Sequence, residues 1–283
     1  MKILSILLML TLFTFSCKKK EEKLPIRNIT FGFESILEDW GEMGGNREIS
    51  AEDDIVISVD TMSEGFQSAK FTVSPSSNVA GGNRAELTFD QNAVEGDIGW
   101  YQYSFFIPEN YQDVALNDAD GKVNWQVLGQ WHHQPVFAEG ETWENYTGEN
   151  ASPPIAIYYN YFDSTDQNYQ ALRNDSKATA VHGFNTAWNK VSTISIVYGE
   201  GAIAIHEIKK GTWNNIKFQI KWSEGDDGFI QVWMNNTEFT DGRIYGANML
   251  NKASHYFKFG LYRNPTIPHT NQLYYDDVRI WSE

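Results

Sequence analysis

The feature of this sequence that most limits its possible folds is a long series of short runs in which apolar and polar residues alternate. Alternation with a period of two is typical of β-strands, whose successive side chains point to opposite faces. Turn-forming sequences rich in Gly, Asp and Asn separate the runs, for example at residues 81–83 and 226–228. Only residues 34–40 and 245–250 suit short helices. The runs that we interpret as strands are 29–33, 55–59, 69–73, 84–89, 100–107, 125–131, 155–161, 194–197, 215–222, 229–234, 256–262 and 273–281.

So many strands without helices between them predict an antiparallel β-sandwich rather than a parallel α/β fold. The chain has 283 residues, and neither an internal repeat nor a linker divides the part that follows the N-terminal segment. We therefore expect one all-β domain over residues 29–283, built as a single jelly-roll sandwich of two large curved antiparallel sheets.

The N-terminal segment has the features of a bacterial export signal. An apolar run over residues 3–15 precedes a serine and then Cys17, the only cysteine of the chain. The run is too short to span a membrane comfortably, which indicates a signal peptide over residues 1–16. A cysteine directly after a small residue is typical of a lipoprotein, so we expect lipidation of Cys17 and a flexible tether over residues 17–28. We expect the protein in the bacterial cell envelope, held to the outer membrane or cell surface through this lipid alone. The alternative is a plainly secreted protein.

The balance of charge argues against one class of partner. Asp and Glu outnumber Lys and Arg by 37 to 22, which gives a formal net charge of −15 at pH 7. A nucleic-acid-binding protein needs a basic stripe against the phosphates, and the sequence has none. The 10 Trp, 14 Tyr and 17 Phe instead suit a surface that handles carbohydrate. We expect a monomer with a polysaccharide as its partner and no nucleic acid.

The run at residues 256–264 combines a core face with a polar face. Period two places Tyr256, Lys258, Gly260, Tyr262 and Asn264 on the same face, opposite apolar side chains. A glycine on that face leaves room for another group to approach the backbone. Lys258 and Tyr262 lie about 13 Å apart along the strand, roughly the length of one or two sugar units. An ordinary solvent-facing strand would show the same pattern, but two further motifs favour a site.

Two other strands supply polar pairs of the same kind. Arg84 and Glu86 share one strand face, where they form either a structural ion pair or a guanidinium aimed at an anionic ligand. Gln130 and His132 share a face at the end of an apolar strand, and imidazole titrates near neutral pH. His133 falls on the opposite face and ranks second to His132 as a candidate.

Together these side chains suit removal of the proton next to a carboxylate. In a uronic acid sugar, the proton on C5 becomes acidic enough when fixed donors neutralise the carboxylate and hold the enolate-like charge. Arg84 and Gln130 are suitable donors, and either His132 or Tyr262 is a suitable base. Tyr262 can also protonate the leaving glycosidic oxygen, which completes a β-elimination. The sequence shows no paired carboxylates of a glycosidase, no serine nucleophile elbow and no zinc motif.

The same segments carry a resemblance to known enzymes. Residues 84–87, 130–132 and 256–264 resemble the three signature strands of jelly-roll alginate lyases. The wider pattern, over about residues 31–281, is similar to the heparin lyase I-like and glucuronan lyase-like polysaccharide lyases. The resemblance implies a concanavalin A-like jelly roll and a lyase that cleaves an anionic polysaccharide such as glucuronan, alginate, ulvan or a heparinoid. It implies no cofactor for catalysis.

The resemblance also implies roles for individual residues. Arg84 and Gln130 would neutralise the uronate, and His132 would be the base. Tyr262 would be the acid, or both base and acid. The substrate-binding candidates are Lys258, Glu86, Asn264 and His133. The chain departs from the alginate lyase pattern after Glu86, where a second arginine is common, and at Asn264, where glutamine is frequent, so alginate is not singled out.

Three further expectations concern the surroundings of the site. Many proteins of this fold hold a structural calcium, and Glu34 and Asp277 could supply oxygen ligands, or could simply face solvent. The irregular residues 137–189 suit loops that wall a cleft, or plain variable loops. The alternative function is a non-catalytic glycan-binding surface lipoprotein, which needs aromatic platforms but no His/Tyr pair beside Arg and Gln.

Overall fold

The computed structural model describes residues 28–90, 93–116, 123–146, 153–163, 180–182, 190–199 and 201–283. The predicted signal peptide, the lipidation site Cys17 and nearly all of the predicted tether lie outside these residues and stay predictions. Within the described ranges, no helix has both the length and the apolar character needed to cross a membrane.

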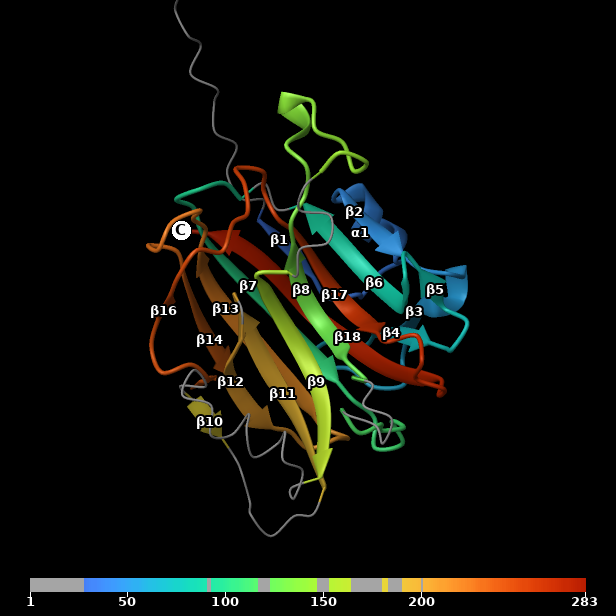
Figure 1. Ribbon diagram of the computed structural model, residues 1–283. Helices are drawn as coiled ribbons and strands as arrows, with labels where there is room; N and C mark the ends of the chain where they lie inside the picture. The colour runs from blue at the N-terminus through green and yellow to red at the C-terminus, as the bar shows by residue number, and fades with distance from the viewer. Residues whose placement is uncertain are drawn as a thin grey trace, which may run out of the picture.

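Two nine-stranded sheets form the molecule (Figure 1). The first, which we call the outer sheet, has the order β15-β14-β13-β7-β18-β4-β3, with β1 beside β18 and β16 beside β14. Its strands are β15 (Thr237–Glu238), β14 (Phe229–Met234), β13 (Trp213–Lys221), β7 (Ile98–Phe106), β18 (Asn271–Ser282), β4 (Ser68–Val73), β3 (Ile55–Ser58), β1 (Ile29–Phe31) and β16 (Ile244–Tyr245).

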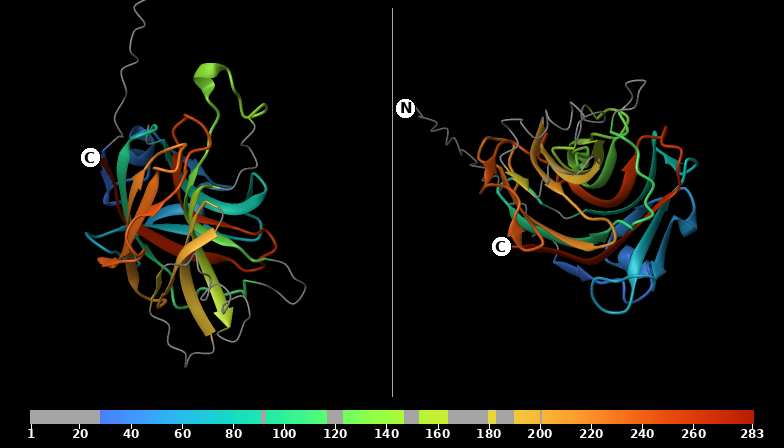
Figure 2. Two further views of the ribbon diagram at one scale, coloured as in Figure 1. Left: turned by 60° about the vertical axis from the view of Figure 1, so that its left-hand side comes forward. Right: turned by 90° about the horizontal axis from the view of Figure 1, so that it is seen from below.

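The second, which we call the inner sheet, has the order β10-β12-β11-β9-β8-β17-β6-β2, with β5 beside β6. Its strands are β10 (Ala180–His182), β12 (Gly201–Glu207), β11 (Lys190–Tyr198), β9 (Ile155–Asp163), β8 (Gln126–His132), β17 (Tyr256–Arg263), β6 (Gly82–Asp90), β2 (Gly45–Glu48) and β5 (Asn78–Val79). Most neighbouring strands run antiparallel, while β10 and β12 pair in parallel. Both sheets curve, and the inner sheet lies on the hollow side (Figure 2). This architecture confirms the predicted jelly roll.

Helical structure is limited to short segments among the described residues. The helix α1 (Glu38–Glu42) overlaps the short helix expected at residues 34–40. The helix expected at residues 245–250 is wrong, because Tyr245 closes β16 and the segment continues in turns. Gly246 donates its N–H to the carbonyl of Gly228 at 2.9 Å, which ties this segment to the hairpin turn instead.

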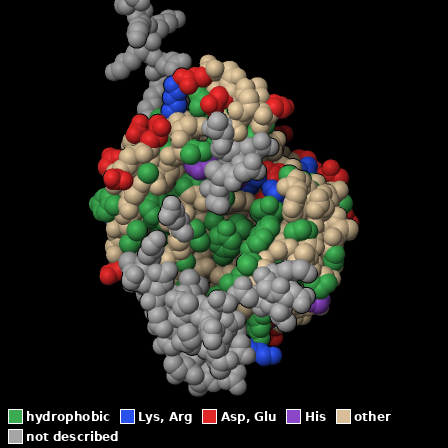
Figure 3. All heavy atoms as spheres, in the orientation of Figure 1, with side chains coloured by type: hydrophobic (Ala, Val, Ile, Leu, Met, Phe, Trp, Pro, Cys, Tyr) green, Lys and Arg blue, Asp and Glu red, His purple; other side chains and the backbone are tan. Residues whose placement is uncertain are grey.

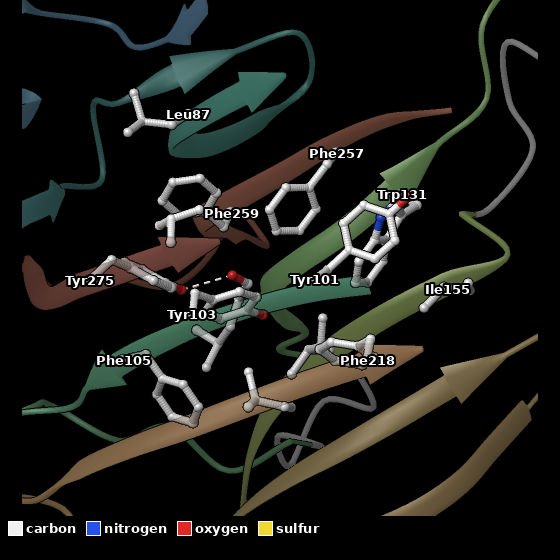
Figure 4. Close-up of a cluster of buried hydrophobic side chains, with 14 of the residues drawn as sticks. Leu87, Tyr101, Tyr103, Phe105, Trp131, Ile155, Phe218, Phe257, Phe259 and Tyr275 are labelled. Atoms are coloured by element: carbon white, nitrogen blue, oxygen red, sulfur yellow. Dashed lines mark hydrogen bonds between the residues drawn. The ribbon is translucent and has the colours of Figure 1, made fainter. Parts of the chain in front are cut away.

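Aromatic side chains from both sheets fill the space between them (Figure 4). Trp131 of β8 packs edge-on against Tyr101 of β7, with ring centroids 5.1 Å apart. Phe257 and Phe259 of β17 are fully buried in the same cluster. Burial of one such Phe side chain contributes about 1.5–3 kcal/mol of transfer free energy, before the loss of conformational entropy. Because apolar and polar residues alternate on β8 and β17, filling this core turns their polar residues to the open face of the inner sheet.

The strand β17 lies at the centre of the site-bearing part of the sheet, between β6 and β8. Its register sets Tyr262 opposite Arg84, Lys258 opposite Thr88 and Gln130, and Tyr256 opposite His132. Gly260 has φ of +143°, and a Cβ there would lie 2.2 Å from the carbonyl oxygen of Ala85. The close approach expected at this glycine is therefore made by the backbone of β6.

Candidate active site

A groove of about 940 Å³ runs along the open face of the inner sheet. The space-filling view shows this face hollowed, with apolar side chains on the floor and Lys, Arg and His atoms towards its upper end (Figure 3). The groove is lined by residues of β2, β6, β8 and β17 and by loop residues. The structure brings the four predicted catalytic residues and one predicted substrate-binding residue into this groove: Arg84, Gln130, His132, Tyr262 and Lys258.

Buried Glu86 holds two of these side chains in place. Its Oε1 accepts a hydrogen bond from Nε2 of Gln130 at 2.7 Å, and its Oε2 lies 3.3 Å from Nη1 of Arg84. Burial raises the pKa of Glu86, and Lys258 is the largest influence that counteracts it. Glu86 is only 1% exposed and does not line the groove, so its contacts indicate support for Arg84 and Gln130.

A second carboxylate, Glu48, lies in the groove itself. It ends the edge strand β2 and pairs in register with Glu86 on β6. Its Oε2 lies 2.6 Å from Nη1 of Arg84, and its Oε1 lies 2.7 Å from Nζ of Lys258. Burial alone would raise the pKa of Glu48, but Lys258 and Arg84 outweigh burial and the pKa is lowered. Glu48 is therefore ionised at neutral pH and bridges the two cations.

The imidazole of His132 is set up to accept a proton. Its Nδ1 lies 2.8 Å from the main-chain oxygen of His133. A carbonyl oxygen can only accept, so the ring proton sits on Nδ1 and Nε2 keeps its lone pair. Burial lowers the pKa of His132 below its ordinary value of 6.5, despite the hydrogen bond to the carbonyl. At neutral pH the ring is neutral and Nε2 is basic.

Two tyrosines flank the cations from opposite ends of the groove. The guanidinium carbon of Arg84 lies 3.7 Å from the ring centre of Tyr262. At the other end, the ring centre of Tyr256 lies 5.3 Å from the ring centre of His132 and 4.9 Å from Nζ of Lys258. Burial raises the pKa of Tyr256, so its phenol stays protonated at neutral pH.

The two groups predicted to move protons are not neighbours. His132 pairs with Tyr256, and Tyr262 follows six residues later on β17. At the usual rise of a strand, their backbone positions are about 20 Å apart along the groove. His132 and Tyr262 therefore approach the pair of cations from opposite sides.

Part of the predicted loop region walls the groove. Trp143 and Pro153 are among the lining residues. The ring of Trp143 is 41% exposed and lies 6.2 Å from that of Tyr256 in an edge-on contact. An exposed aromatic beside a polar groove is suited to stacking on a sugar ring. Residues 147–152, 164–179 and 183–189 of this region lie outside the described part of the chain.

Besides Glu86, two other predicted substrate-binding residues lie outside the groove lining. The side chain of Asn264 donates to the carbonyl of Val123 at 2.8 Å and accepts from the N–H of Thr266 at 2.9 Å, which places it in a turn. Nδ1 of His133 lies 2.7 Å from Nε2 of His255, and burial lowers the pKa of His133 to about 4. His133 therefore packs behind His132 as a neutral ring.

The predicted calcium ligands have protein partners of their own. Glu34 accepts hydrogen bonds from the backbone N–H groups of Phe66 and Gln67 at 2.8 and 3.3 Å. Asp277 accepts from Nε of Arg279 at 2.7 Å. Calcium needs several oxygen ligands around it, and the structural calcium stays a prediction. Among the described residues, no group of three or more His, Cys, Asp or Glu side chains is placed to hold a metal.

The family model described as polysaccharide lyase matches residues 35–279, which is most of the chain. The chain belongs to the polysaccharide lyase family. No curated protein sequence matches this lyase.

Solved structures share the fold of the lyase at low sequence identity. An endo-β-1,4-glucuronan lyase from the fungus Trichoderma reesei aligns with a TM-score of 0.55 and 16% identity, over 90% of this chain and 95% of the other. A variant of alginate lyase Aly36B in complex with alginate trisaccharide aligns with a TM-score of 0.53 and 12% identity, over 92% of this chain and 99% of the other. The catalytic domain of a family 131 glycoside hydrolase from Coprinopsis cinerea aligns with a TM-score of 0.55 and 10% identity, over 92% of this chain and 94% of the other. These likenesses show the fold alone, and that fold carries both lyases and a hydrolase.

The sequence interpretation missed Glu48 as a groove residue. It placed Tyr256 on the polar face of the predicted strand but assigned it no role, and Tyr256 lines the groove. Glu48 gave little signal, since β2 is only four residues long and shows no sustained alternation. Its position follows from the pairing of β2 with β6, which no local pattern specifies.

Proposed function

We propose that this lyase cleaves a uronic-acid-containing polysaccharide by β-elimination. The observation that carries the proposal is the placement of Arg84 and Lys258 in one groove with the neutral imidazole of His132. Two cations can neutralise a uronate carboxylate, which makes the proton on C5 removable. The groove has a volume of about 940 Å³, and Trp143 offers a ring for a neighbouring sugar.

Each polar side chain has a role in the proposed reaction. Arg84 and Lys258 bind the carboxylate, and the second N–H of the Gln130 amide donates to the charge that grows on it. Nε2 of His132 takes the proton from C5, and the electrons of that bond form a double bond between C4 and C5. The bond from C4 to the glycosidic oxygen breaks, and the phenolic proton of Tyr262 reaches that oxygen through water in the groove, because the backbone positions of His132 and Tyr262 lie about 20 Å apart. Exchange with water then returns His132 and Tyr262 to their starting states.

The proposal is tested by incubating the purified protein with glucuronan, alginate, ulvan and a heparinoid. We expect the ultraviolet absorbance of the new double bond to rise with at least one of them. Tyr262→Phe should lower turnover by about 100-fold, because general acid catalysis contributes at least that much, while substrate binding survives. The matched control is Tyr245→Phe, which removes the same hydroxyl from a ring that is 62% exposed on β16.

Each other outcome has a definite meaning. No rise in absorbance with any substrate contradicts the elimination. New reducing ends without absorbance indicate hydrolysis, the chemistry of the family 131 neighbour. Retention of a glycan without any product favours the non-catalytic glycan-binding lipoprotein. Lipidation at Cys17 and a location in the cell envelope are part of our proposal and rest on the sequence alone.

A further inference from the structure

The carboxylate of Glu48 occupies the position between the two cations of the groove. One of its oxygens lies 2.6 Å from Nη1 of Arg84, and the other lies 2.7 Å from Nζ of Lys258. A carboxylate is planar, and each oxygen accepts from a separate donor. A uronate carboxylate bound by the same two cations would need the same place and the same orientation.

The charges around this position already balance without a ligand. Burial raises the pKa of Glu86, but both of its oxygens face donors, as they do in a carboxylate. Its Oε1 accepts from Gln130, and its Oε2 lies 3.3 Å from Arg84 and 4.0 Å from Lys258, so two carboxylates face two cations. An additional carboxylate would enter a site with no surplus positive charge among these four groups. A bound uronate therefore requires that one of the two glutamates gives up its contacts.

Only one of the two glutamates is free to move. The side chain of Glu86 is 1% exposed and also accepts from Gln130, so moving it would leave buried donors unpaired. The side chain of Glu48 is 27% exposed and lines the groove. It stands at the end of β2, the edge strand beside β6, so it can rotate towards solvent without breaking a strand pair in the centre of the sheet.

We propose that Glu48 is an internal stand-in for the substrate carboxylate, which a uronate must displace in order to bind between Arg84 and Lys258. Displacement exchanges one anion for another, so the central position takes one uronate, and the described lining residues include no further Lys or Arg for a sulfate on the same sugar. Glu48 thereby sets the affinity of the groove and restricts it to unsulfated uronates. The choice of uronate as the ligand rests on the proposed function.

The test measures binding rather than turnover. The probe is methyl β-D-glucuronoside, which has no glycosidic bond at C4 and so cannot be cleaved by elimination there. Titration calorimetry at neutral pH compares the wild-type protein with Glu48→Gln, which keeps the shape but removes the charge. We expect the variant to bind the probe about tenfold more tightly, a change of about 1.4 kcal/mol. Methyl β-D-glucoside, which has no carboxylate, should bind the variant no more tightly than the wild type.

The matched control is Glu52→Gln, the same chemical change at an exposed glutamate that pairs with Arg47 outside the groove lining. It should bind the glucuronoside like the wild type. Unchanged or weaker binding by Glu48→Gln would overturn the proposal and show that Glu48 merely positions the cations. If Glu48→Gln does not fold, Glu48→Asp decides, because it keeps the charge but is too short to meet both cations. That variant should bind the probe more tightly than the wild type, and no gain overturns the proposal.

Failure of the proposed function is distinguishable from failure of this inference. If the wild-type protein forms no unsaturated product but Glu48→Gln binds the glucuronoside more tightly, the elimination is contradicted and the inference about Glu48 stands. If the wild-type protein cleaves a polyuronate but Glu48→Gln binds the glucuronoside no more tightly, the elimination stands and the inference about Glu48 is contradicted.

Discussion

His132 differs from its charged neighbours in the groove because it is neutral at neutral pH. Burial lowers its pKa, and the nearby charges of Lys258 and Arg84 also oppose protonation of the ring. The hydrogen bond from Nδ1 to the carbonyl of His133 fixes the tautomer. The groove therefore separates residues that hold charge from one residue that can accept a proton.

This difference predicts how activity depends on His132 and on pH. His132→Ala should lower kcat by about 100-fold or more with little change in KM, because the variant lacks the base. In the wild type, the lowered pKa keeps the base neutral until the pH falls below 6.5, so the loss of kcat/KM on the acid side should begin below that value. The measurement is kcat/KM against pH, with His269→Ala as the control outside the groove lining. An acid-side loss centred above 6.5, or full activity of His132→Ala, would assign the proton to another group.

Single residues were predictable where a local pattern placed them. Alternation within one strand was enough to bring Arg84, Gln130 and His132 to the groove face, because neighbours two apart share a face. Asn264 was extrapolated from the same alternation, but β17 ends at Arg263 and the following turn redirects the side chain. Residues placed by pairing between distant strands could not be found in this way.

At the scale of elements, β17 depends on one glycine for its fit against β6. Gly260 lies where the register between β17 and β8 shifts, and its carbonyl accepts a hydrogen bond from the buried hydroxyl of Tyr275 at 2.7 Å. A side chain at this position would meet main-chain atoms of Ala85 and Glu86, which cannot swing aside. The glycine thus sets both the spacing of the strands and the position of Glu86 behind the groove.

We therefore predict that Gly260→Ala destabilises the protein. The free energy of unfolding should fall by about 2–4 kcal/mol, since the new methyl group adds a clash with the backbone to a positive φ. Urea unfolding measures the change. Gly41→Ala is the control, because a Cβ at Gly41 meets nothing within 4 Å and lies in α1, where alanine is favoured. Equal stability of Gly260→Ala and the wild type would show that β6 and β17 can separate without cost.

The strands themselves were largely predictable, because each long run carries its own alternation and turn signals. The exceptions are elements with weak local signals. β12 was not predicted, and its sequence includes Gly201, Ala202 and Ala204, which have low strand propensity. Residues 245–250 were given a helix because neither their pairing with β14 nor the contact of Gly246 with Gly228 can be seen in the local sequence.

At the scale of the whole molecule, the sandwich places a nearly charge-balanced groove on a strongly acidic protein. The net charge of the chain is −15 at pH 7, while Arg84 and Lys258 are matched in place by Glu48 and Glu86. The composition alone gives the net charge. It could not predict the balance inside the groove, because that balance depends on β2, β6 and β17 lying side by side.

An acidic molecule with a balanced groove should meet a polyanionic substrate against its own electrostatic field. The long-range repulsion slows encounter at low ionic strength, and added salt screens it within a Debye length of about 10 Å at 0.1 M. We expect kcat/KM on a long unsulfated polyuronate to rise about two- to fivefold as NaCl increases from about 20 to 200 mM. A uronate tetrasaccharide carries few charges and should respond less, which makes it the control for salt effects on the chemistry. A steep fall of kcat/KM on the polymer over this range would contradict the prediction. It would mean that attraction by a basic groove outweighs the field of the whole protein, so that Glu48 and Glu86 do not neutralise the groove towards an approaching polymer.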